Sequence, residues 1–69
     1  MLISLLILPG SGQQDVTLNE GTTIRQLVQA KSLHGRQIIL NVSTILESGY
    51  DRVLRSGDEV AATASVKGA

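Results

Sequence analysis

Few side chains in this sequence are of the types that bind metal ions or catalyse reactions, and each lacks the second ligand or catalytic group that such a site needs. His34 is the only histidine and there is no cysteine, so a metal ion would find no second imidazole or thiolate ligand. Asp58 and Glu59 are adjacent in "SGDE", which favours a solvated turn over two carboxylates facing each other for acid–base catalysis. We therefore expect no metal site, no cofactor and no enzymatic activity of the chain on its own.

Two short motifs match known signatures without the context that those signatures need. Gly10 and Gly12 in "PGSGQQ" are spaced as in a phosphate loop, but no Lys-Ser/Thr pair and no helix follows them. A hairpin turn is the favoured interpretation. Asn41 in "NVS" matches a glycosylation sequon, yet nothing else in the sequence indicates secretion.

Length and composition limit the classes of protein that fit. The chain has 69 residues, six basic and six acidic side chains, no Phe or Trp, and Tyr50 as its only aromatic. We expect one domain over residues 1–69, with a short tail at 67–69. Charges this balanced and scattered argue against binding nucleic acid or an anionic membrane surface. "MLISLLIL" lacks the positive start of a signal peptide and is too short to span a bilayer. We expect it to be a buried strand, in a protein that is cytoplasmic or within a larger particle and is not secreted.

The apolar pattern predicts five extended segments. The first is an apolar run that is broken only by Ser4 and ends at "PGSG", and the second alternates strictly between polar and apolar residues, with Val16 and Leu18 inward. A Gly-rich loop between them predicts a hairpin. Gly57 and Asp58 predict a tight turn before the last strand. The expected strands cover residues 2–8, 14–18, 38–42, 44–46 and 59–66.

One segment, "TIRQLVQAKSLHG", has a helical pattern. Thr23 can cap the helix and Gln26 can reach back to form a capping box, while Gly35 stands where a left-handed C-cap belongs. Three apolar residues share one face at the helical period: Ile24, Leu27 and Val28. The pattern predicts a helix from Thr23 to about Leu33.

The order strand, strand, helix, strand, short strand, strand predicts an α+β fold. A single helix after a hairpin must cover one face of the sheet. We therefore expect a mixed sheet of four to five strands with one helix across one face, which is the β-grasp or ubiquitin-like plan. The first and last strands would lie side by side in its centre.

The same segments resemble a known family, the small sulfur carriers of thiamine biosynthesis and the small subunit of molybdopterin synthase. "TIRQLV" is similar to the capped "T-V-x-E-L-L" helix start of that family. "LNVSTI" resembles its third strand, Tyr50 stands where many members have an aromatic, and "LRSGDEV" is similar to its "L-x-D-G-D-x-V/I" turn. The resemblance covers nearly the whole chain, and the chain runs on after that turn for about as many residues as family members do.

The resemblance implies a specific use for the tail "ASVKGA". In the family the last two residues are glycines, and an activating enzyme adenylates the terminal carboxylate before sulfur replaces the adenylate. Gly68 matches the first of these positions, but Ala69 stands at the second and places a methyl group next to the reacting carbon. A misplacement of about 1 Å in such a site can cost on the order of 100-fold in rate. The strand before the tail also departs from the family, because it carries small residues where carriers have larger apolar ones.

The free face of the predicted sheet is the candidate surface for a partner. The strand at residues 2–8 is apolar on both sides, and one helix covers only one of them, so either Ile3, Leu5 and Ile7 or their alternates must point away. Small side chains on the last strand would let a partner approach closely. The candidate docking residues are Leu5, Ile7, Ala62, Ala64 and Val66.

Three functions remain open at this point. The first is a non-catalytic module that docks on a protein partner or on copies of itself, as a small subunit of a complex or a virus particle. The second is a sulfur carrier that works with an adenylating enzyme through Gly68 and Ala69. The third is a precursor that is trimmed to expose Gly68.

Overall fold

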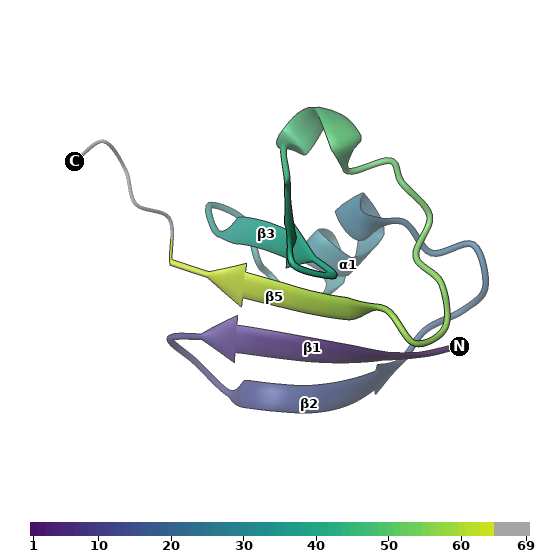
Figure 1. Ribbon diagram of the computed structural model, residues 1–69, viewed down its shortest axis with the longest axis horizontal. Coiled ribbons are helices and arrows are strands. Elements are labelled where there is room, and N and C mark those ends of the chain that lie inside the picture. The colour runs from purple at the N-terminus through teal and green to yellow at the C-terminus, as the bar shows by residue number, and fades with distance from the viewer. Residues whose placement is uncertain (65–69) are drawn as a thin grey trace.

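Residues 1–64, which the computed structural model describes, form a five-stranded mixed sheet with one α-helix (Figure 1). The strands lie in the order β2–β1–β5–β3–β4. Their bounds are Leu2–Leu8 for β1, Gly12–Thr17 for β2, Gln37–Leu40 for β3, Ser43–Ile45 for β4 and Glu59–Thr63 for β5. The helix α1 spans Ile24–Ala30, and a short 3-10 turn, η1, spans Glu47–Gly49. This arrangement confirms the predicted α+β, β-grasp-like fold.

The first and last strands lie side by side in the middle of the sheet, as predicted (Figure 1). β1 and β5 are parallel, with Leu5 opposite Val60 and Leu8 opposite Thr63. β2 and β3 are antiparallel to their central neighbours. The parallel register places the end of β5 next to the β1–β2 turn, so both lie at one end of the sheet.

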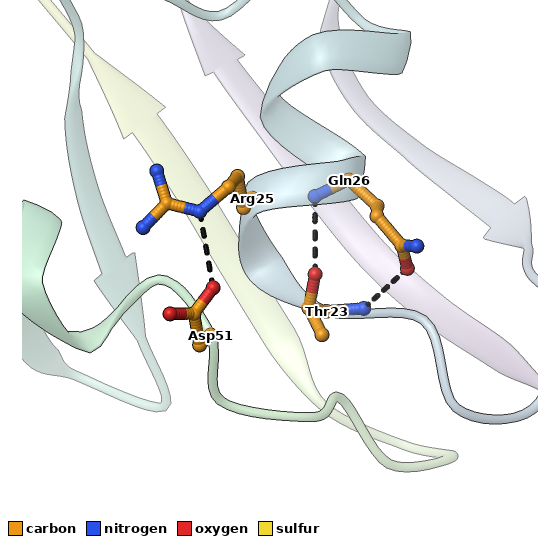
Figure 2. Close-up of polar contacts among 4 residues, drawn as sticks. All are labelled: Thr23, Arg25, Gln26 and Asp51. Carbon is orange, nitrogen blue, oxygen red and sulfur yellow. Dashed lines mark hydrogen bonds and ion pairs between the residues drawn. The ribbon is translucent and has the colours of Figure 1, made fainter.

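The start of α1 has the predicted capping box (Figure 2). The Gln26 amide N–H donates to Thr23 Oγ1 at 3.2 Å, and the Thr23 amide N–H donates to Gln26 Oε1 at 2.9 Å. The next two amides are also satisfied, because Ile24 N–H donates to the Arg52 carbonyl and Arg25 N–H to the Tyr50 carbonyl. The first amides of a helix have no intrahelical partner. Here other groups of the chain accept a hydrogen bond from the amides of Ile24, Arg25 and Gln26.

The end of α1 differs from the expectation. The helix stops at Ala30 with Lys31 as its C-cap, not near Leu33, and the left-handed residue that ends it is Ser32 with φ 56° rather than Gly35. The Leu33 amide N–H donates back to the Val28 carbonyl at 2.9 Å and the Ser32 amide N–H to the Gln29 carbonyl at 3.4 Å. These are the two bonds of a Schellman motif. Leu33 is then buried against the core, which favours this early stop.

Strand ends also shift from the predicted ranges. β2 begins at Gly12 and ends at Thr17, and β3 ends at Leu40 because residues 41 and 42 form the turn into β4. β5 ends at Thr63, whereas the sequence pattern predicted a strand to residue 66. Gly57 has φ 89° in the turn before β5, a conformation that glycine adopts at no steric cost. Residues 65–69 lie outside the described part of the chain.

The core lies between α1 and one face of the sheet. The helix contributes the predicted residues Ile24, Leu27 and Val28. The strands contribute the alternate residues that point toward the helix, and Leu33 and Leu54 are buried with them. The strand residues in the core are Ile3, Leu5, Val16, Ile38, Leu40, Val60 and Ala62. Within residues 1–64 no polar or charged side chain is buried, so this core depends on aliphatic packing.

Residues 1–64 contain no helix of the length and hydropathy that a membrane span requires.

Candidate docking surface

Strand alternation leaves one face of the sheet without a covering element among the described residues. Successive side chains of a strand point to opposite faces, and the buried set of each strand points toward α1. The opposite set is here called the free face. Its members are Leu2, Ser4, Leu6 and Leu8 on β1, Gln13, Asp15 and Thr17 on β2, Gln37 and Ile39 on β3, Thr44 on β4, and Glu59, Ala61 and Thr63 on β5.

An aliphatic row crosses the middle of the free face. Leu6 lies opposite Ala61 in the β1–β5 register, and Ala61 lies opposite Ile39 in the β5–β3 register. Because the Ala61 side chain is a single methyl group between two larger side chains, the surface dips at this point. The resulting hollow has a volume of about 260 Å³. We call it the aliphatic hollow; its lining includes Leu6, Ile39, Val42 and Ala61, together with Ser4, Gln13 and Glu59.

Three further exposed aliphatic side chains lie on the free face or beside the hollow. Leu2 and Leu8 lie at the two ends of β1 on the free face and are 51% and 47% exposed. Val42, in the β3–β4 turn beside the hollow, is 94% exposed. Isolated exposed aliphatic residues are ordinary, but several on one sheet face form the kind of patch that marks an interaction surface.

The structure corrects the predicted docking residues on β1 and β5. Leu5 and Ala62 are fully buried in the core, so neither is accessible to a partner. Ile7 is half-buried and packs against the same core. Ala64 is exposed just beyond β5, and Val66 lies outside the described residues. The reason is strand parity, since the odd-numbered residues of β1 face the helix and their alternates face away.

A signal in the sequence could have identified the outward set. Ser4 is the only polar residue in β1, and a polar residue in a strand with one buried face belongs on the other face. Its cross-strand neighbours, Asp15 on β2 and Glu59 on β5, are both charged and exposed. The parity of Ser4 therefore points to Leu6 as the outward residue.

The free face carries charge of one sign only. Asp15 and Glu59 flank Ser4 at the end of the face where β1 begins, and no basic residue belongs to the free face as defined above. The two ion pairs found in residues 1–64 involve Glu20 and Asp51, so the Asp15 and Glu59 carboxylates have no ion-pair partner there. The free face therefore combines an aliphatic hollow with an acidic edge.

Asp58 stabilises the turn before β5, where the sequence predicted it. It accepts the Arg55 amide N–H at 2.8 Å and the Asn41 side-chain amide at 3.1 Å. Asn41 in turn accepts the Glu59 amide N–H at 2.9 Å. These bonds tie the β3–β4 turn to the turn before β5, and so position Glu59 and the Val42 hairpin next to each other.

A second polar cluster lies where the segment after η1 meets α1 (Figure 2). Arg25 Nε donates to Asp51 Oδ1 at 3.0 Å, and the Arg25 guanidinium lies 5.9 Å from the centre of the Tyr50 ring. Burial raises the pKa of Tyr50 above its ordinary value, the nearby Glu47 carboxylate raises it further, and Arg25 opposes both. These contacts fasten the loop to the helix.

The remaining sequence candidates stand apart from one another. His34 is exposed in the loop between α1 and β3, and within residues 1–64 no three His, Cys, Asp or Glu residues gather as metal ligands. Gly10 and Gly12 lie at the β1–β2 turn, as expected. The tail residues Gly68 and Ala69 lie outside the described part of the chain. Comparison with protein-family models and with curated protein sequences found no match to this chain, so the likeness to sulfur carriers stays an expectation.

Proposed function

We propose that this protein is a non-catalytic, β-grasp-like docking module that binds another protein chain, or a second copy of itself, through the free face. The observation that supports the proposal is the aliphatic row Leu6–Ala61–Ile39, which is partly exposed to solvent on the face opposite α1. Burying such a row would stabilise a complex by roughly 25 cal/mol for each Å² of apolar surface that is removed from water. We expect the binding to occur in the cytoplasm or inside a larger particle.

The composition of the free face resembles that of a protein interface. Interfaces combine an apolar centre, depleted of charge, with a polar rim. Here the aliphatic row has no charged member, while Gln13, Asp15 and Glu59 lie at its margin. The fold itself does not need this row, because the core is complete on the other face of the sheet.

The test introduces a charge into the row without touching the core. Leu6→Lys and Ile39→Lys should leave the domain folded by circular dichroism, because both side chains are only half-buried and lie on the free face. Each should abolish self-association in sedimentation experiments, or binding of the partner in pull-downs. Leu5→Lys is the matched control in the neighbouring position, and it should unfold the domain because Leu5 is fully buried.

The proposal fails if the wild-type protein stays monomeric at high concentration and every protein it binds also binds Leu6→Lys equally well. It fails equally if Leu6→Lys unfolds the domain as Leu5→Lys does, since Leu6 would then belong to the core.

The alternative is a sulfur carrier, and the central position of β5 supports it because the last strand leads into the tail there. We expect the Ala69 methyl group to hinder activation. In ATP–pyrophosphate exchange with a sulfur-carrier activating enzyme, the wild-type chain should react weakly and Ala69→Gly should react faster. Equal and rapid reaction of both chains would favour the carrier over the docking module. A precursor would instead gain activity when Ala69 is removed to leave Gly68 at the terminus.

A further inference from the structure

The β3–β4 turn contains a residue whose backbone conformation is unfavourable for its type. Leu40 pairs with Ser43, so the loop between them has only two residues, Asn41 and Val42. Both have positive φ, 48° and 65°. Two-residue hairpins of this kind prefer Asn-Gly, because both loop positions need a left-handed backbone. Asn41 fits this preference, but valine is β-branched and is a genuine outlier at positive φ.

Val42 gains no burial within the domain that would offset this strain. Its side chain is 94% exposed and lies on the rim of the aliphatic hollow. The strained backbone therefore destabilises the isolated domain, and the exposed side chain contributes no burial that would compensate. Such outliers concentrate at functional sites, where another interaction compensates for the strain. A partner that covers the hollow would bury Val42 together with Leu6 and Ile39.

The charge beside the hollow indicates the kind of partner. Glu59 lines the hollow and has no ion-pair partner within residues 1–64, and Asp15 lies two strands away on the same edge. The free face has no basic residue, so a second copy applied through this face would bring acid toward acid. A different protein with a lysine or arginine at this point would neutralise the edge.

We propose that the aliphatic hollow, with Val42 on its rim, receives an aliphatic side chain from a segment of a different protein, and that a lysine or arginine beside that side chain pairs with Glu59. This inference rests on the proposed docking function and deepens it by naming the chemistry of the partner segment. It assigns Val42 as a contact residue, although valine there weakens the isolated fold.

The experiment selects peptides from a displayed random library on the wild-type domain. The selected peptides should share a Leu, Ile or Val next to a Lys or Arg, and one synthetic peptide of this consensus then serves as the probe. Its affinity should fall when ionic strength rises from about 0.1 M to 1 M, because the Debye length shortens from about 10 Å to 3 Å. Peptides that bind the free face without a basic residue, or a probe insensitive to salt, would overturn the inference.

Three variants locate the contacts. Val42→Gly should weaken the probe about tenfold, the loss expected when one well-packed contact is removed, and should raise the midpoint of thermal unfolding. Glu59→Gln should weaken binding several-fold at about 0.1 M ionic strength and remove most of the salt dependence. Leu46→Asn is the control, because Leu46 is also highly exposed, at 73%, but has a negative φ and lies outside the hollow. It should change neither affinity nor salt dependence.

The outcomes separate this inference from the docking function itself. Suppose that Leu6→Lys abolishes binding of the probe, whereas Val42→Gly and Glu59→Gln leave it unchanged. This result would overturn the inference and keep the docking function. The inference would also be overturned if the Val42→Gly variant were less stable than the wild type, because Val42 would then stabilise the folded domain. If no selected peptide depends on Leu6, the inference fails, and the docking function fails with it when the wild-type protein also stays monomeric at high concentration.

Discussion

Tyr50 is the side chain whose surroundings most change its chemistry. It is half-buried beside η1, with Arg25 over its ring and Glu47 nearby. Burial and the Glu47 carboxylate both oppose ionisation of the phenol, while the Arg25 guanidinium favours it. The balance raises the pKa of Tyr50, with burial as the largest cause. As the only tyrosine in a chain without tryptophan, it can be observed directly by ultraviolet absorbance.

We predict that Tyr50 titrates above its ordinary pKa in the folded protein. Because the folded pKa is raised, the Tyr50 contribution to stability is complete below about pH 10 and is lost as pH rises through the folded pKa. Glu47→Gln should lower the pKa part of the way back, and Glu20→Gln, which lies next to the amino terminus instead, should leave it unchanged. A phenol that titrates at or below its ordinary value in the wild-type protein would contradict this reading.

At the scale of the element, α1 depends on the rest of the chain for its stability. It has seven residues, and isolated helices shorter than about 12–15 residues are marginal in water. The Thr23–Gln26 capping box and the carbonyls of Tyr50 and Arg52 satisfy its first amides. Ile24, Leu27 and Val28 then fix it to the sheet. The helix therefore forms together with the sheet and with the segment after η1.

We predict that Leu27→Ala lowers the free energy of unfolding by about 2–5 kcal/mol, because Leu27 is buried between the helix and the sheet. Urea denaturation followed by circular dichroism measures the change. Gln29→Ala, on the exposed side of the same helix, should change stability by less than about 0.5 kcal/mol. A nearly neutral Leu27→Ala would show that the helix packs by another face.

At the scale of the whole molecule, the domain is small, and the elements of residues 1–64 cover the sheet on one side only. A chain of this length buries only about 60% of its unfolded surface, so its margin of stability is narrow. The sheet directs most of its aliphatic residues toward α1 and leaves a shorter aliphatic row on the other face. Although the whole chain is neutral, the free face carries only acidic charge. We proposed a partner segment with a basic residue because of this local asymmetry.

Much of the fold was predictable from local patterns. The capping box of α1 and its apolar face at Ile24, Leu27 and Val28 follow from residue type and helical period, and both are confirmed. The order of elements predicts the mixed sheet with β1 beside β5, because one helix after a hairpin must return the chain across one face. These features depend on contacts close in sequence or on general rules of connection.

The orientation of β1 needed the tertiary structure. Both parities of this strand are apolar apart from Ser4, so hydrophobic pattern alone did not decide between Leu5 and Leu6 as the outward residue. The register of β1 against β2 and β5 decides it, because a shift of one residue would move the whole buried set to the other face. The docking residues were misplaced for this reason.

Val42 illustrates the same limit at the β3–β4 turn. In the sequence it reads as the last residue of an apolar strand, yet in the structure it is the exposed second residue of a two-residue hairpin. Valine has no local preference for that conformation; the pairing of Leu40 with Ser43 imposes it. Sequence by itself determined which elements form and in what order. Only the tertiary structure decided which side chains they expose, because strand register and turn geometry depend on pairing between segments far apart in the chain.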